Sequence, residues 1–352
     1  MKSRYSMLSR HLRAFLAACL AATVLAFGLT AQAADRKVTV VVGSTSFVWF
    51  PLYVAHGAGY FKDEGLDVEV VRVAANSTPV AAILGGNADI GGIGPQAVFA
   101  AMEKGQPIKV LVSMADAYTS TLFVRKELLK EKGVTRDSPI KDRVKALTGL
   151  KLATTAIGAG PHLMYRYLFQ HYADGADVDK VATIVPIGDA SATLAGMQRG
   201  LVDASAFTPP VPEKAVADGY AEVLIDFIGG DVPAAQDMIY ATMSVTEEKL
   251  KTDGPMLAAF VRAIDRANKL AQQDLTAAGN AARGFMKELQ SDLYASAVKA
   301  MQPALPKSTL VSVRGLDNAL KLLEVGGYKF PNVDVSKLPV NDFIEQALAR
   351  KM

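Results

Sequence analysis

One sequence pattern occurs twice in this chain, at a constant separation of 114 residues. Residues 81–105 and residues 194–219 each read as a helix that ends at a glycine, a buried strand, a polar loop and a helix started by proline. Glycine can adopt the left-handed conformation that ends a helix, and proline suits a first helical turn. The matched pairs are Ser77 and Ser191, Gly86 and Gly200, Asp89 and Asp203, Pro95 and Pro209, and Gly105 and Gly219.

The repeat predicts two halves of the same α/β design. A chance recurrence of helix, glycine and strand is the alternative, but the matches extend over a whole unit without a gap. Two such halves leave a cleft between their loops, and clefts are where small ligands bind. The repeated Asp89 and Asp203 stand at strand entries, where we expect each carboxylate to cap backbone N–H groups of the tight turn rather than contact a ligand.

Strand-like and helix-like segments alternate along most of the chain, which indicates βαβ units and mostly parallel sheets. Strands are predicted at 37–43, 67–73, 89–92, 108–114, 121–125, 151–155, 182–186, 204–207, 223–226 and 239–244. Helices are predicted at 51–63, 79–84, 95–103, 162–170, 191–199 and 212–218, with a surface helix and loop at 126–148. From Thr246 onward the pattern becomes helical, at 255–273, around 277–300, and at 315–325 and 341–350.

Two of these strands, 121–125 and 239–244, are expected to carry the chain from one half to the other and back. The prediction is therefore a first lobe of residues 34–119 plus 240–352 and a second lobe of residues 120–239. A chain of 352 residues is long enough for each lobe to bury its own core.

The first 33 residues have the composition of a secretory signal peptide. Four basic residues precede an apolar run at 14–30, and Ala31-Gln32-Ala33 forms a cleavage site, so export and cleavage after Ala33 are expected. A membrane anchor is the first alternative, although the run is short and lacks a positive stop. A lipoprotein attached at Cys19 is the second, although few apolar residues separate Arg13 from Cys19.

Removing this segment changes the charge and the thiol chemistry of the chain. The whole sequence carries 38 basic and 35 acidic residues, and the signal holds four of the basic ones, which leaves a net charge of −1. Nothing then favours nucleic acid or a membrane surface as a partner. Cys19 is the only cysteine, so the processed chain has no disulfide, thiol nucleophile or cysteine-ligated zinc. Its three histidines, His56, His162 and His171, lack metal-ligand spacing.

Several spaced motifs resemble one family of exported proteins. They are Gly59-Tyr60-Phe61, Glu64-Gly65-Leu66, Val68, Gly86-Asn87-Ala88-Asp89-Ile90-Gly91 and Gly105-Gln106-Pro107. These resemble the solute-binding proteins of ABC importers in the nitrate/sulfonate/taurine-binding and thiamine-precursor-binding-like family. The similarity covers residues 37 to about 245. It implies a type II periplasmic-binding-protein fold, an α/β architecture of two doubly wound lobes around a ligand cleft, and no cofactor. From the residues themselves, the Gly59-Tyr60-Phe61 motif is expected to pack in the core.

The candidate ligand-binding residues lie in the strand-to-helix loops, because ligands in open α/β sheets bind beyond the carboxyl ends of the strands. The first lobe is expected to supply Thr45, Ser46, Phe47, Trp49, Asn76, Ser77, Gly94 and Gln96. The second is expected to supply Gly158, Ala159, Gly160, His162, Asp189, Phe207 and Thr208, and the hinge Tyr118 and Thr119.

Two of these loops suggest a chemistry. Trp49, the only tryptophan, suits stacking on a flat or apolar ligand, although a core position is the alternative. The Gly158–His162 loop opens a helix, whose N–H groups and dipole can hold an anion, although an ordinary loop has the same composition. His162 could donate to a ligand or face solvent.

The charges near these loops leave the ligand open. The loops hold no arginine or lysine cluster, although Arg166 stands one turn into the following helix, and Asp189 opposes an anion unless it points away or meets an amine. A sulfonate, a carboxylate, a zwitterion and a neutral heteroaromatic ring such as a pyrimidine all remain possible.

Three functions compete. The first is the binding subunit of an importer, a monomer in the periplasm whose partners are an ABC permease, its ATPase and a small organic ligand. The second is an enzyme of the thiamine-pyrimidine type on the same fold. That branch uses a cysteine-rich iron motif, which the processed chain cannot supply, and no serine elbow, zinc or phosphate-loop motif is present. The third is a receptor for another transporter class.

Overall fold

The computed structural model describes residues 35–73 and 78–349. The predicted signal peptide with Cys19, and the predicted site residues Asn76 and Ser77, lie outside the described residues. From Arg36 onward the chain forms one compact unit. Among the described residues, no helix is both long and apolar enough to span a bilayer.

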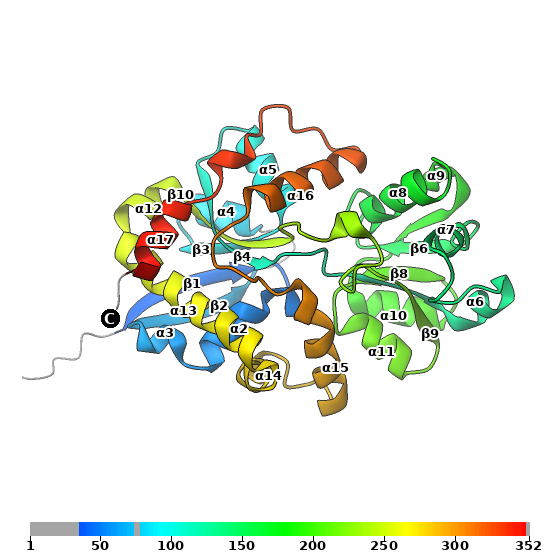
Figure 1. The fold of residues 1–352 in the computed structure, drawn as a ribbon, viewed down its shortest axis with the longest axis horizontal. Helices are drawn as coiled ribbons and strands as arrows, with labels where there is room; N and C mark the ends of the chain where they lie inside the picture. The colour runs from blue at the N-terminus through cyan, green and yellow to red at the C-terminus, as the bar shows by residue number, and fades with distance from the viewer. Residues whose placement is uncertain (1–34, 74–77, 350–352) are drawn as a thin grey trace, which may run out of the picture. The chain divides into compact units, whose positions relative to one another are not determined.

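The first of two sheets has five strands in the order β2-β1-β3-β10-β4 (Figure 1). β1 (Arg36–Val42) runs parallel to β2 (Leu66–Arg72) on one side and to β3 (Ile90–Ile93) on the other. β10 (Ala241–Thr246) is antiparallel and lies between β3 and β4 (Ile108–Ala115). The apolar residues of β1 are buried, as expected of a strand covered on both faces.

The second sheet has the order β7-β6-β8-β5-β9. β6 (Lys151–Thr154) runs parallel to β7 (Thr183–Pro186) and to β8 (Ala204–Phe207). β5 (Thr121–Arg125) is antiparallel and lies between β8 and β9 (Ala221–Asp226). Each sheet thus has the same topology, and its antiparallel strand begins where the chain arrives from the other sheet. This repetition agrees with the sequence repeat.

The repeated glycines and aspartates have the same roles in both halves. Gly86 and Gly200 end helices at φ +72° and +70°, a conformation that other residues rarely adopt. The Asp89 carboxylate accepts a hydrogen bond from the backbone N–H of Thr39 at 2.8 Å, and that of Asp203 accepts one from Lys151 at 2.9 Å. Both aspartates therefore tie the start of one strand to its parallel neighbour. A structural role is confirmed, but the N–H groups that they bind belong to the neighbouring strand and not, as predicted, to the tight turn.

The two halves contain these helices between their strands. The first half holds the 3-10 turn η1 (Phe47–Trp49), α2 (Phe50–Gly57), α3 (Tyr60–Asp63), α4 (Pro79–Leu84) and α5 (Pro95–Glu103). The second holds α6 (Lys126–Lys132), α7 (Ile140–Lys145), α8 (Gly160–Tyr172), α9 (Val178–Val181), α10 (Ala190–Gln198), α11 (Val211–Ala217) and η2 (Pro233–Ala235). The remainder holds α12 (Glu247–Thr252), α13 (Gly254–Gln273), α14 (Leu275–Ala282), η3 (Arg283–Phe285), α15 (Ser291–Met301), η4 (Gln302–Ala304), α16 (Val313–Val325), η5 (Val335–Lys337) and α17 (Asn341–Ala349).

Three predicted elements differ from the structure. The helix predicted at 51–63 is interrupted at Gly59, whose φ of +77° separates α2 from α3. Pro209 does not start a helix in the manner of Pro95, since α11 begins only at Val211. The helix predicted around 277–300 is divided into α14, η3 and α15.

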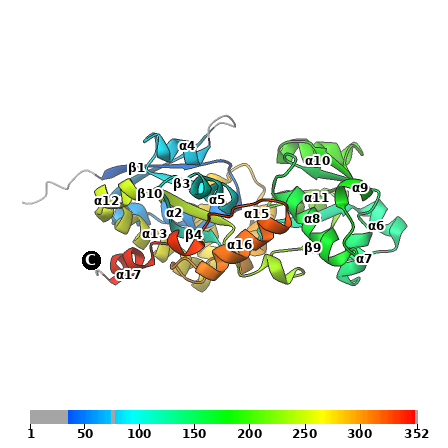
Figure 2. The same cartoon turned by 90° about the horizontal axis from the view of Figure 1, so that it is seen from above.

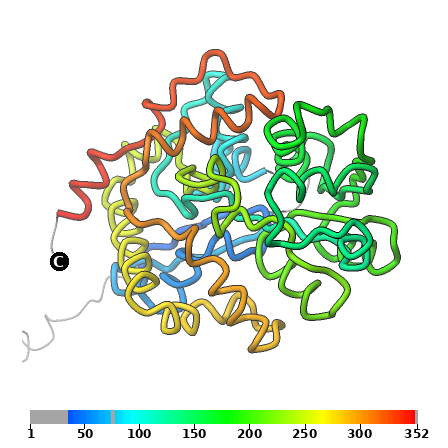
Figure 3. The backbone as a smooth tube through the Cα atoms, turned by 45° about the vertical axis from the view of Figure 1, so that its right-hand side comes forward, coloured from blue at the N-terminus to red at the C-terminus, as the bar shows by residue number. Residues whose placement is uncertain are grey.

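The C-terminal helices cover the first sheet and reach the second. α13 packs on α2, α3 and β2, and Phe260 of α13 stacks on Phe61 with the ring centroids 5.0 Å apart. The core-packing role predicted for the Gly59-Tyr60-Phe61 motif is therefore correct for Phe61. α16 contacts both α5 of the first half and α8 of the second (Figure 2). Figure 3 traces the chain from the first sheet into the second and back into these helices.

Candidate functional site

A cavity of about 280 Å³ lies where the strand-end loops of the two sheets meet. Its wall comes from η1, the start of α5, the start of α8, the two segments that cross between the sheets, and α16. The lining residues are Val48, Trp49, Gly94, Pro95, Gln96, Tyr118, Gly160, Leu163, Met164, Met238, Tyr240, Ala241, Ala319, Leu322 and Leu323. This is the position that the strand polarity of an α/β sheet predicts for a ligand.

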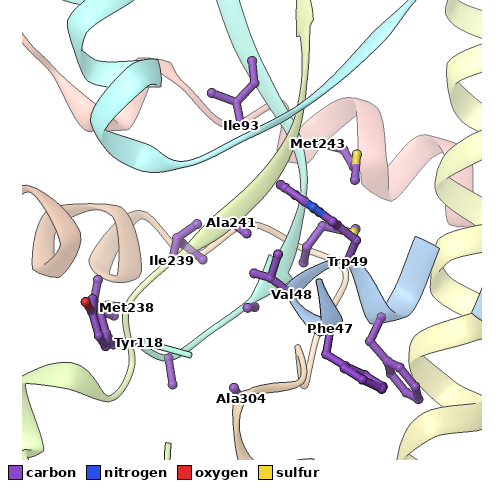
Figure 4. Close-up of a cluster of buried hydrophobic side chains, with 14 of the residues drawn as sticks. Phe47, Val48, Trp49, Ile93, Tyr118, Met238, Ile239, Ala241, Met243 and Ala304 are labelled. Atoms are coloured by element: carbon purple, nitrogen blue, oxygen red, sulfur yellow. The ribbon is translucent and has the colours of Figure 1, made fainter. Parts of the chain in front are cut away.

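Trp49 forms one side of this cavity. The ring packs over β3, where a Cβ added at Gly92 would come within 3.0 Å of the ring carbon Cη2. Figure 4 shows Trp49 and Val48 beside Ala241 and Met243 of β10. The side chain is buried, and within the described residues its indole Nε1 has no hydrogen-bond partner. A buried N–H without a partner costs free energy, and an acceptor atom on a bound ligand would remove that cost.

Tyr118 supplies a second polar group of the same kind. It stands in the first crossing segment beside Met238 (Figure 4), and its ring makes an edge contact with Tyr240, the two ring centroids being 4.9 Å apart. The Tyr118 hydroxyl is buried and has no partner among residues 35–73 and 78–349. Burial raises the pKa of the Tyr118 hydroxyl well above its ordinary value, so the group keeps its proton and can donate.

Two helix N-termini adjoin the cavity. Gly94 is the N-cap of α5 and Pro95 follows it, while Gly160 begins α8. The first backbone N–H groups of a helix have no partner within it, and the helix dipole makes that end partly positive. Both ends favour oxygen atoms with negative or partial negative charge.

The rest of the wall is apolar. Leu163 and Met164 of α8 line the same cavity as Ala319, Leu322 and Leu323 of α16. In the part of the chain that the structure describes, no charged side chain lines it. The site can therefore hold a compact molecule with an apolar body and hydrogen-bond acceptors, using neutral donors.

Some predicted site residues of the first half take other positions. Phe47 is buried in the core, with its ring centroid 5.4 Å from that of Tyr294. The Ser46 hydroxyl caps η1 by accepting from the N–H of Val48, and Thr45 is exposed in the loop after β1. None of these three lines the cavity, because the loop turns into η1 and directs only Val48 and Trp49 inward.

The second half contributes less than predicted. Of Gly158, Ala159 and Gly160, only Gly160 lines the cavity. Thr119 and Thr208 share a hydrogen bond of 3.1 Å, and Phe207 packs in the small core beside the second sheet. Asp189, predicted to be close to a ligand, is exposed and caps α10 by accepting from the N–H of Ala192 at 2.9 Å.

His162 does not line the cavity and does not face solvent. It is 1% exposed, its Nδ1 accepts from the N–H of Gly158 at 2.9 Å, and its Nε2 lies 2.7 Å from the Asp179 carboxylate. Because Nδ1 accepts a hydrogen bond, the ring proton is on Nε2, and this N–H donates to the Asp179 carboxylate. Arg166, considered as an anion contact, binds the other oxygen of Asp179 instead.

Several lining residues have no recognisable signal in the sequence. Met238 and Tyr240 lie in the second crossing segment, where no motif marks them. Ala319, Leu322 and Leu323 lie on the buried face of an amphipathic helix, a pattern that is equally typical of core packing. Only the return of α16 to the strand ends makes this face part of a site.

Solved structures of other proteins establish the fold. A protein from Bordetella bronchiseptica aligns with a TM-score of 0.71 and 22% identity, over 89% of this chain and 96% of its own. The periplasmic aliphatic sulphonate binding protein SsuA from Escherichia coli aligns with a TM-score of 0.61 and 18% identity, over 89% of this chain and 97% of its own. A desulfurization enzyme, DszB, aligns with a TM-score of 0.64 and 15% identity, over 89% of this chain and 99% of its own. The fold is thus the periplasmic-binding-protein fold.

The sequence comparison then gives the family. A family model described as NMT1/THI5 like matches residues 46–278, and the chain belongs to that family. YtlA of Bacillus subtilis, described as a binding protein, is 34% identical over 82 residues. That stretch is 22% of this chain and spans only 25% of YtlA.

Proposed function

We propose that this protein is the exported solute-binding subunit of an ABC importer. In this proposal it captures a small organic molecule in the cavity at the strand ends and delivers it to a membrane permease served by an ATPase. The predicted signal peptide, the family and the names of its structural neighbours support a periplasmic location. The protein acts as a monomer of two lobes, residues 34–119 plus 240–352 and residues 120–239, which close around the ligand.

One observation carries the proposal. Trp49 and Tyr118 both line one cavity, and the indole N–H of Trp49 and the hydroxyl of Tyr118 are buried without a partner within the described residues. Buried polar groups in folded proteins are almost always hydrogen-bonded, so two such groups on one cavity point to a ligand that satisfies them. The ligand class that fits is a sulfonate, a carboxylate or a pyrimidine-like ring, with its acceptor atoms at these donors and its apolar part against α8 and α16.

Binding can be tested with the single tryptophan as the reporter. The purified protein is titrated with butanesulfonate, butanoate, an aminopyrimidine and butylamine while Trp49 fluorescence is recorded, and calorimetry gives the affinity. We expect binding of at least one compound with an acceptor, and none of butylamine, because no carboxylate among the described lining residues can pair with an ammonium group. Indifference to every acceptor compound, or preference for the amine, would refute this ligand class.

An enzyme is the second candidate, and the fold shared with DszB is the observation that favours it. The thiamine-pyrimidine type of enzyme needs several cysteines, and this chain has only Cys19. Mass spectrometry of each bound compound, before and after long incubation with the protein, separates the two functions. Unchanged compounds support transport, and a new product would support catalysis.

A further inference from the structure

The segment that follows α16, Gly326–Tyr328, touches the second half of the molecule at three points. The guanidinium of Arg166 on α8 donates to the Gly326 carbonyl at 3.2 Å. The Tyr328 hydroxyl donates to the Gly158 carbonyl at 2.9 Å. Gly326 also packs so closely on α8 that an added Cβ would lie 2.7 Å from a methyl carbon of Leu163. The contact is therefore both polar and sterically fitted.

The partners of this segment in the second half are joined to each other. The Gly158 N–H donates to His162 Nδ1 at 2.9 Å, and His162 Nε2 is 2.7 Å from one oxygen of Asp179. The other oxygen of Asp179 accepts from Nε and from a terminal nitrogen of Arg166, at 2.9 and 2.7 Å. Burial would raise the pKa of Asp179, but the hydrogen bonds from Arg166 and His162 outweigh it and lower that pKa. The carboxylate thus stays charged and keeps both partners oriented.

The hydrogen bonds consequently form a closed ring. It runs from Tyr328 through Gly158, His162, Asp179 and Arg166 to Gly326, and the chain from Gly326 to Tyr328 completes it. A ring of this kind holds the segment at two fixed positions, so loss of one link weakens the others.

The same tyrosine is attached to the first half. Its ring stacks on Phe330 with an interplanar angle of 1°, and Phe330 makes an edge contact with Phe99 of α5. Its hydroxyl also accepts a hydrogen bond from Gln96 Nε2. Gln96 lines the cavity but Tyr328 does not. Tyr328 can therefore influence a bound ligand only through Gln96 and through the arrangement of the two halves.

We propose that Gly326–Tyr328 is a clasp between the halves, and that Tyr328 is a positioning residue which favours the closed form of the binding site. This inference deepens the proposed function and rests on it, since a clasp has a use only where closure retains a ligand. Breaking the clasp lowers the fraction of molecules that are closed, and the apparent affinity falls in proportion.

The first test needs no ligand. Cys19→Ser removes the only natural cysteine, and Lys104→Cys in the first half and Lys130→Cys in the second, both exposed, carry spin labels. Double electron–electron resonance spectroscopy then gives the distribution of distances between the two spin labels. We expect Tyr328→Phe and Arg166→Gln each to broaden this distribution toward longer distances. Tyr172→Phe, on α8 but outside both the ring and the cavity lining, is the control and should leave it unchanged.

The second test uses whichever titrated compound binds. Tyr328→Phe should speed its dissociation about threefold to tenfold, the effect of losing the one ordinary hydrogen bond that the hydroxyl makes between the halves. Tyr328→Phe combined with Arg166→Gln should have less than the product of the two single effects, because both break one ring. An unchanged label distribution in the folded Tyr328→Phe variant would overturn the clasp even if ligands bind. Failure of every compound to bind while the distribution broadens would instead overturn the proposed function and leave the clasp.

Discussion

The two halves of this molecule share one topology but differ in which of their buried polar groups lie at the cavity. In the second half, the Tyr165 hydroxyl donates to the Ala153 carbonyl at 2.8 Å, and His162 uses both of its ring nitrogens. At the cavity wall, Trp49 of the first half and Tyr118 of the first crossing segment hold buried donors without partners among the described residues. The second half also has buried polar atoms without partners in the part of the chain that the structure describes, at Ser205 and Tyr220, but neither residue lines the cavity. The repeat therefore supplies a framework, whereas the unsatisfied donors of residues at the cavity mark the place that we propose for a ligand.

The equivalent positions of the repeat give the comparison more detail. Glu213 of α11 corresponds to Phe99 of α5 at the same separation of 114 residues. Gly92, against which the Trp49 ring packs, corresponds to Ala206. Each pair places unlike side chains at matched positions of the repeat, and each offers a way to test what the difference does.

The largest effect is expected at Glu213. Burial, with a smaller contribution from the charge of Asp226, raises its pKa to about 7, above the ordinary value of 4.5. The folded state therefore favours the neutral acid. The contribution of Glu213 to the free energy of unfolding is fully present below about pH 4.5 and is lost as the pH rises through about 7. Glu213→Gln should be more stable than wild type by about 3 kcal/mol at pH 8 and nearly equal at pH 4.5.

Urea unfolding at these two pH values measures the difference. Glu222→Gln, at an exposed position on β9, is the control and should not change the pH dependence. A Glu213→Gln variant whose stability followed the wild-type curve would show that this buried carboxyl has an ordinary pKa.

The next effect concerns the repeated aspartates. Asp203→Ala and Asp89→Ala each remove a carboxylate that holds a strand N–H and a cation, Arg125 for Asp203 and Lys249 for Asp89. A loss of about 2 kcal/mol is expected for Asp203, since its side chain is the more buried, and less for Asp89. Chemical denaturation measures the two losses of stability. A larger loss for Asp89→Ala than for Asp203→Ala would mean that burial of the carboxylate does not determine the size of the loss.

A smaller and more selective effect separates the two buried tyrosines. Tyr118→Phe should weaken ligand binding about tenfold and leave stability unchanged or higher, because its hydroxyl has no partner in the described part of the protein. Tyr165→Phe should cost about 1 kcal/mol of stability and leave affinity unchanged. Calorimetry and thermal unfolding of both variants provide the measurement. Equal behaviour of the two would remove the distinction between donors reserved for a ligand and donors of the core.

The smallest effect is expected from exchanging the glycine and the alanine at matched strand positions. Gly92→Ala would place a Cβ 2.9 Å from Val42 and 3.0 Å from the Trp49 ring, so the ring must shift and binding should weaken severalfold. Ala206→Gly should cost about 1 kcal/mol of stability without a change in binding. Trp49 fluorescence of the unliganded Gly92→Ala variant reports the shift, and an unaltered spectrum would argue against it.

The sequence alone determined the framework. The periodicity of the apolar residues, together with the glycines and prolines, predicts most strands and helices, because local conformational preferences act on neighbouring residues. The spacing of 114 residues gave the two-fold design, and the strand polarity gave the edge at which the cavity lies.

Only the tertiary structure decided which loop residues face the cavity. Phe47 and Trp49 are two residues apart and equally aromatic, but the turn of η1 sends one into the core and the other to the cavity. His162 and Asp189 are suited to a ligand by type, yet nearby backbone groups and Asp179 already occupy their polar atoms. The wall formed by α16 and the link through Tyr328 join segments more than 150 residues apart, as in the pair of Tyr328 and Gly158. Such contacts depend on where helices return to a sheet, and no local pattern in the sequence encodes that path.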